Sequence, residues 1–149
     1  MFPLDGLSNR TGAMRILNYG RVLIAAGTVL SSVFLPSAEA AVGNVVFSTG
    51  NVVIRSQAGV DRPGMIGAPI EVGDSIVTNE GRAQVRFSDD GYMSFQPATI
   101  FRVDDYNYDK RADGAEKAIF NLIKGGLRAV TGLIGKRNKA DYQVNTTIA

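Results

Sequence analysis

The sequence predicts an all-β protein, with short antiparallel strands in a solenoid- or sandwich-like arrangement, preceded by a helical signal peptide. Three observations support this fold class. Seventeen glycines and five prolines in 149 residues interrupt the chain too often for long helices. Turn signals recur about every 8–12 residues beyond residue 40. Residues 82–87 alternate polar and apolar side chains with the period of two that marks a strand with one buried face.

The N-terminal segment has the order of a secretory signal. Arginines precede an uncharged apolar stretch at residues 22–35, and a short run of small residues follows it. Ala38 and Ala40 are the small residues that place cleavage before Ala41, so we expect residues 1–40 to be removed. The alternative is an uncleaved anchor, although the apolar stretch as a helix reaches only about 21 Å of a ~30 Å hydrocarbon core.

The start of this signal is open to a second interpretation. A start at Met14 would give a basic segment of more ordinary length, and a peptide covering residues 1–13 would refute that hypothesis. In both cases the functional body is residues 41–149. We expect it to be periplasmic or otherwise extracytoplasmic, with no stable membrane span after cleavage.

Short runs of β-branched and aromatic residues fill this body, bounded by Gly, Pro, Asn and Asp. Arg82, Arg86 and Arg102 are expected on the solvent side of strands, with a ligand patch as the alternative interpretation. The runs that we expect to form strands are residues 45–47, 52–54, 70–72, 75–78, 82–87, 92–95, 99–103, 118–123, 127–131 and 142–144.

Three dipeptides between these runs are interpreted as turns. In the Gly-Asp pair, the carboxylate is expected to accept bonds from backbone N–H groups one or two residues on. In the Asp-Gly pair, the glycine is expected to take a positive φ. The turn positions are Gly73, Asp74, Asp90, Gly91, Gly125 and Gly126.

Residues 119–134 fit two patterns. Apolar residues recur at helical spacing among lysines and arginines, which is typical of a cationic amphipathic helix on a membrane. Four glycines between positions 125 and 135 oppose the helix, because each interior glycine costs about 0.8–1 kcal/mol relative to alanine. We therefore predict a strand at 118–123, a Gly-Gly turn and a strand at 127–131.

Composition excludes several function classes. The chain has no cysteine and no histidine, which excludes disulfides, zinc fingers and every Ser-His or Cys-His catalytic pair. Sixteen basic and fourteen acidic residues give a net charge of +2, which is too balanced to indicate nucleic-acid binding. We expect no cofactor.

Oxygen-bearing side chains between residues 105 and 116 match part of a calcium-binding loop. Lys110 stands where such a loop needs glycine for its sharp turn, so we interpret this segment as an acidic surface loop. The matching residues are Asp105, Asn107, Asp109, Asp113 and Glu116.

Six segments, in order, resemble the FecR domain, a bacterial extracytoplasmic module. They include Gly73-Asp74-Ser75-Ile76-Val77-Thr78, which matches the family's G-D-x-I-x-T box, and a strand ending in Asp-Gly. Together they cover nearly all of the body; the segments are residues 43–46, 72–78, 83–91, 96–99, 124–128 and 142–146.

The resemblance implies a β-rich envelope module that meets another protein, with a strand before Gly-Leu-Arg at 126–128. Family members continue from a V-x-T-x-x-A segment into a G-x-R-G-T box. The implied domain at 41–149 is therefore expected to be incomplete at its C-terminus. Only residues 1–40 precede it, so direct control of a sigma factor is not supported.

Three functions remain open on the sequence. We expect an exported, non-catalytic module for sensing or protein interaction, whose partner is an unidentified envelope protein. The alternative is a structural protein that touches anionic lipid or glycan through the basic segment 117–139. A secreted hydrolase with paired carboxylates is the third, although the acids lie in turns or in the 104–116 loop.

Overall fold

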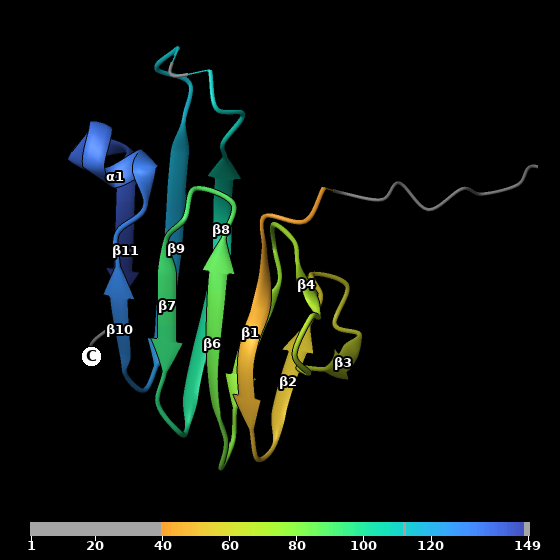
Figure 1. Cartoon of the computed structure of the whole chain (residues 1–149). Coiled ribbons are helices and arrows are strands. Elements are labelled where there is room, and N and C mark those ends of the chain that lie inside the picture. The colour runs from red at the N-terminus through yellow and green to blue at the C-terminus, as the bar shows by residue number, and fades with distance from the viewer. Residues whose placement is uncertain (1–39, 112, 148–149) are drawn as a thin grey trace, which may run out of the picture. The chain divides into compact units, whose positions relative to one another are not determined.

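Two open β-sheets face each other across one hydrophobic core in the computed structural model, which describes residues 40–111 and 113–147 (Figure 1). The all-β prediction is confirmed, and the arrangement is a sandwich. Most of the predicted signal peptide, Ala38 included, lies outside the described residues, while Ala40 and Ala41 are exposed at their start. Within the described part of the chain, no helix is long and apolar enough to span a membrane.

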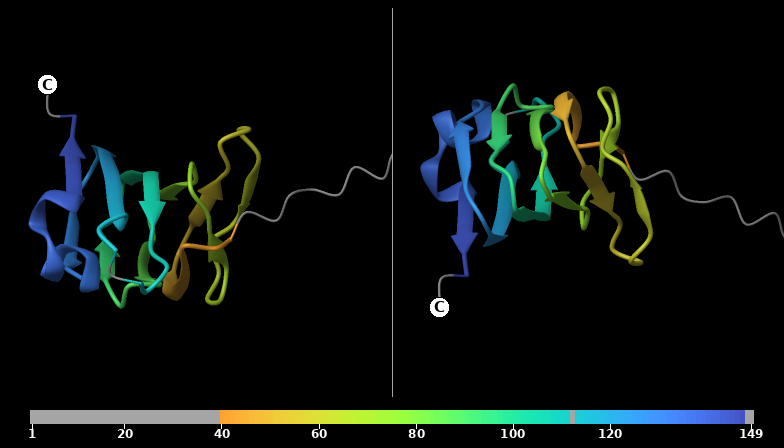
Figure 2. Two further views of the ribbon diagram at one scale, coloured as in Figure 1. Left: turned by 90° about the horizontal axis from the view of Figure 1, so that it is seen from above. Right: turned by 90° about the horizontal axis from the view of Figure 1, so that it is seen from below.

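Sheet A has the strand order β10-β7-β6-β1-β4, and sheet B has the order β11-β9-β8-β5-β2-β3. Seen from above and below, the sheets form two layers (Figure 2). The elements are β1 (Gly43–Thr49), β2 (Val52–Arg55), β3 (Asp61–Pro63), β4 (Pro69–Ile70), β5 (Ser75–Thr78), β6 (Arg82–Phe87), β7 (Tyr92–Phe95), β8 (Thr99–Asn107), β9 (Lys117–Lys124), β10 (Leu127–Val130), α1 (Leu133–Arg137), η1 (Lys139–Asp141) and β11 (Tyr142–Thr146).

Most turns carry the chain from one sheet to the other. Among the described strands, only β2–β3, β6–β7 and β8–β9 are hairpins between consecutive strands of the same sheet. The Gly-Gly turn joins β9 of sheet B to β10 of sheet A. Gly125 has φ +88° there, and a Cβ on it would come within 2.6 Å of the Thr99 Cα, so this crossing needs glycine.

Aromatic rings fill the core where β8 and β9 face β6. Phe120 lies at the centre, with ring centroids 5.0 Å from Phe87, 5.4 Å from Phe101 and 5.7 Å from Tyr142. The alternation at 82–87 is confirmed, because its apolar residues are buried and its arginines exposed. Arg102 is exposed on β8 as well.

Residues 118–123 and 127–130 are strands, so the prediction of strands over an amphipathic helix is confirmed. Three features were not foreseen. The segment at 61–63 forms the short strand β3, and α1 follows β10. The last strand, β11, pairs in parallel with β9, which corrects the expectations of antiparallel strands throughout and of an end without partners.

Candidate functional site

Buried carboxylates are the first groups to examine for chemistry. Asp74 is 2% exposed and accepts hydrogen bonds from the Arg62 guanidinium at 2.6 Å and the Glu71 N–H at 2.9 Å. The expected bonds to residues further along the chain are therefore wrong, because the carboxylate turns back toward Glu71 and across to β3. Gly73 beside it has φ +86°, which favours glycine.

Asp89 holds the β6–β7 hairpin to α1. Its buried carboxylate accepts the Gly91 N–H at 3.1 Å and the Ile134 N–H at 3.3 Å. Its own N–H donates to the Tyr106 hydroxyl at 3.0 Å, and burial raises the pKa of that phenol above its ordinary value. In the next position, Asp90 has the positive φ, 64°, that was expected of Gly91. Aspartate tolerates a positive φ better than most residues, so the turn forms although Gly91 does not adopt a positive φ.

Glu116 is buried as well, in an ion pair with Arg137 of α1. Three acids thus lie inside the protein, although Asp74 and Asp89 lie at turns and Glu116 at the end of the 104–116 loop, as expected. Each is engaged in its own ion pair or set of backbone bonds. Among the residues that the structure describes, no three acidic side chains gather closely enough to hold a metal ion.

The calcium-loop match uses side chains that are occupied with neighbours. Asp105 pairs with Lys117 at 3.0 Å, and Asn107 donates to the Ala115 carbonyl at 2.8 Å. Asp109 accepts the Arg111 N–H, and Asp113 accepts the Ala115 N–H. These bonds stabilise the β8–β9 connection, and the oxygens do not converge on a common point.

The basic segment 117–139 is divided between different parts of the fold. Lys117 and Lys124 lie at opposite ends of β9 in sheet B, whereas Arg128 lies on β10 in sheet A. Lys136 and Lys139 line an open pocket of about 380 Å³ beside Tyr142. The segment therefore does not form the single basic surface that the alternative function requires.

The outer face of sheet A does gather side chains of one kind, and we call it the arginine face. Cross-strand partners point to the same side of a sheet, so the register places residues in rows. The burial pattern of β6 shows which side is outward, because Arg82 and Arg86 are exposed while Ala83, Val85 and Phe87 are buried. The hydrogen bond from the Gln84 amide to Ser94, 3.0 Å, lies on this outward side. One row is Phe47, Gln84, Ser94 and Arg128, and the next is Asn44, Arg86, Tyr92 and Val130.

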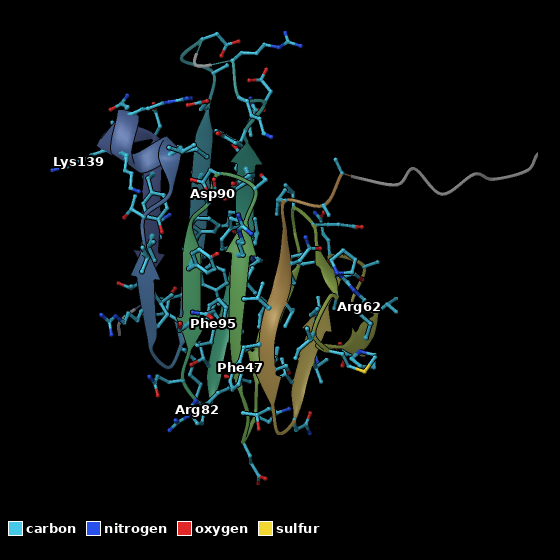
Figure 3. The ribbon with its side chains drawn as sticks, in the orientation of Figure 1. Phe47, Arg62, Arg82, Asp90, Phe95 and Lys139 are labelled. Atoms are coloured by element: carbon cyan, nitrogen blue, oxygen red, sulfur yellow. The ribbon has the colours of Figure 1, made fainter. Side chains whose placement is uncertain are left out.

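Positive charge and apolar surface lie side by side on the arginine face. Phe47 is 48% exposed and Val130 is 55% exposed, and Phe47 and Arg82 both lie on this side of the molecule (Figure 3). The Arg86 guanidinium lies 5.8 Å from the centroid of the Tyr92 ring. Its hydrogen bond to Asp90, at 2.6 Å, raises the pKa of Arg86 above its ordinary value.

A bulge explains why Phe47 could not be placed on this face from the sequence. The register of β1 against β6 shifts between Val45 and Phe47, so the phenylalanine points outward although simple alternation from buried Val45 would turn it inward. An open hollow of about 670 Å³ adjoins the bulge and is lined in part by Asn44, Val46 and Arg86. No turn residue marks the bulge in the sequence.

Comparisons with known proteins add little to this geometry. No protein-family model matches the chain, and no curated protein matches it. A solved structure described as a cell surface anchoring domain is similar at 26% identity and a TM-score of 0.40, over 41% of this chain and 82% of that one. Likeness at this level carries no conclusion about fold or function, and the resemblance to the FecR domain stays a prediction.

Proposed function

We propose that this protein is an exported, FecR-like module of the bacterial envelope that binds a protein partner and catalyses no reaction. The signal-like N-terminal segment and the six ordered segments support the location and the kinship. The observation that carries the binding role is the arginine face, where Arg82, Arg86 and Arg128 stand among exposed aromatic and aliphatic side chains.

This composition suits a protein interface. Arginine, tyrosine and phenylalanine are enriched at the energetic centres of protein interfaces, where apolar contact and charge-assisted bonds combine. Backbone ladders on β10, β7, β6 and β1 hold the side chains in place, so little order has to be gained on binding. The partner is expected to present carboxylates to the arginines next to an apolar group that packs on Phe47 or Val130.

The non-catalytic part of the proposal is supported by the state of the buried acids. Asp74, Asp89 and Glu116 are each bonded to a neighbour that stabilises the fold. A carboxylate hydrolase needs two acids that face each other across a substrate-sized gap. The lipid- or glycan-binding alternative is less favoured, because its basic residues are divided between the two sheets and α1.

Site-specific photo-crosslinking in the envelope tests the proposal. A photoreactive phenylalanine at position 47 is expected to give one discrete crosslinked product, whereas the same group at Val77, on the outer side of sheet B, gives none. Arg86→Ala with Arg128→Ala should reduce the product about tenfold, because interface arginines of this kind are often hot spots. The matched control is Arg102→Ala on β8.

Two outcomes would contradict the proposal. Equal crosslinking from positions 47 and 77 would show that sheet A has no preferred partner. Recovery of the protein from the cytoplasm, with residues 1–40 still present at its N-terminus, would refute the exported location.

A further inference from the structure

The four edge strands of the sandwich differ in how they meet solvent. β3 and β4 have only three and two residues, and each contains a proline. Short, charged or proline-containing edges resist the addition of another strand. β11 has five residues, Tyr142-Gln143-Val144-Asn145-Thr146, with no charge, no proline and no bulge against β9.

The outer edge of β11 carries backbone groups that can pair. Thr147 donates its N–H to Leu122 of β9, and alternate residues of a strand point their backbone groups to opposite sides. Val144 and Thr146 therefore direct their N–H and C=O groups away from β9. The Tyr142 N–H already donates to Lys139, which leaves the Tyr142 carbonyl as an acceptor on that edge.

We propose that β11 pairs antiparallel with β11 of a second copy of this chain, about a two-fold axis at Val144. In that register, the two Val144 residues exchange both backbone bonds. Each Thr146 N–H donates to the Tyr142 carbonyl of the other copy. The Tyr142 N–H does not take part, because it already donates to the Lys139 carbonyl. The result is four backbone hydrogen bonds and a sheet B that continues through both copies.

Side chains in this register are self-complementary. Val144 faces Val144 and Tyr142 faces Thr146 on the core side, while Gln143 faces Asn145 on the outer side. A two-fold axis places identical surfaces together, so any charge on the strand would meet a like charge nearby. Residues 142–147 contain none.

The neighbouring edge of sheet A extends the contact. β10 ends sheet A on the same side of the molecule where β11 ends sheet B (Figures 1 and 2). Its residues Arg128, Ala129 and Val130 are exposed, and Tyr142 and Val144 are only partly buried. Two copies joined at this end would cover both layers, and the contact would reach the edge of the arginine face at Arg128 and Val130.

The test is the oligomeric state of the exported chain purified from the envelope. Sedimentation is expected to show a dimer at about 100 µM protomer. Thr146→Pro removes the outward N–H and should weaken dimerisation about tenfold or more. Thr147→Pro is the matched control, because it removes a bond to β9 and should lower thermal stability while the dimer persists.

A cysteine crosslink fixes the register. Directly opposed residues of a hydrogen-bonded antiparallel pair have Cα atoms about 5.5 Å apart, within the range that a disulfide spans. The chain has no other cysteine, so Val144→Cys should oxidise to a covalent dimer. Asp61→Cys on β3 is the control and should stay monomeric.

Three results would overturn the proposal. One is a monomer at every concentration, and another is a dimer that Thr146→Pro leaves unchanged. The third is a monomer whose Val144 and Thr146 amide hydrogens resist exchange, because it would show that another segment occupies this edge.

Discussion

The two ends of the sandwich are built differently. Arg62 lies at the β3–β4 end (Figure 3). It reaches from sheet B to the Pro69 carbonyl of sheet A at 2.7 Å, while the same guanidinium binds buried Asp74. At the β10–β11 end, Tyr142 and Val144 pack against the core, and the described residues include no ion pair between these two strands. At the first end, the clasped end, a charged side chain joins the two edge strands. At the second, the apolar end, the edge strands pack by apolar contact, and the pair of buried Glu116 with Arg137 of α1 lies beside them.

The difference bears on association. A buried ion pair at a sheet edge disfavours strand addition, because a new strand would have to displace or desolvate it. An uncharged edge over partly buried aromatic residues has no such barrier. The clasped end is therefore expected to stay in contact with solvent, and the apolar end to be where a second copy of the chain binds.

Loss of the central aromatic ring, Phe120, should have the largest effect on the stability of the apolar end. Phe120→Ala is expected to lower the free energy of unfolding by about 3–5 kcal/mol, because Phe120 touches the core on β6, β8 and β11. Urea titration followed by circular dichroism measures it. The control is Ile54→Ala near the clasped end, with a cost of about 2–5 kcal/mol.

If the two ends share one core, both variants should unfold in a single transition. Two separate transitions in Phe120→Ala would show that the apolar end unfolds independently, and would break the comparison.

Breaking the clasp should have the next largest effect. Arg62→Ala leaves the Asp74 carboxylate buried with only the Glu71 N–H, and should cost about 3 kcal/mol, the lower end for a buried pair because Arg62 is partly exposed. Thermal unfolding measures it. Arg55→Ala, which removes the fully exposed pair with Asp61, should leave the melting temperature almost unchanged.

Equal effects of Arg62→Ala and Arg55→Ala would show that the clasp is an ordinary surface pair. In that event the two ends would differ in sequence but not in stability.

The smallest expected effect is a change in stability at alkaline pH, caused by Tyr142 at the apolar end. Burial raises the pKa of Tyr142 from 10.0 to about 12. The unfolded chain then loses this proton first, so stability is retained below pH 10 and falls as pH rises toward about 12. Tyr142→Phe removes this loss and should move the alkaline unfolding midpoint upward in circular dichroism.

Tyr106→Phe is the comparison variant, because Tyr106 is a buried tyrosine in the centre of the core. This substitution also removes the hydrogen bond from the Asp89 N–H to the Tyr106 hydroxyl. An alkaline midpoint unchanged in Tyr142→Phe would show that this side chain is solvated, and that the apolar end is looser than its contacts indicate.

Local pattern was enough to predict the strands. Alternation at 82–87 identified both faces of β6, and the glycines near 125 favoured two strands over a helix. These features depend on residues close together in the sequence, where backbone preference and the period of side chains decide the outcome. The Asp-Gly dipeptide likewise marked a hairpin, although the positive φ fell on Asp90.

Features that depend on distant residues could not be predicted in this way. The sequence does not tell which sheet a strand joins, so the parallel pairing of β11 with β9 was missed. The Arg62–Asp74 pair and the bonds from Asp89 to α1 join segments that only the finished fold brings together. The arginine face was foreseen only in part, because Arg82 and Arg86 were expected to face solvent, whereas a one-residue bulge in β1 exposes Phe47 and Arg102 lies in the other sheet.

The crossing turns have a consequence for biosynthesis. β1 can pair with β6 only after β6 has been synthesised, and sheet A is complete only when β10 has followed. Sheet B is complete later still, when β11 joins β9. Strands β1 to β8 pair with one another, so most of both sheets can form once residue 107 is free. Because a strand pair needs both partners present, each sheet keeps one unfinished edge until β9, β10 and β11 have been made.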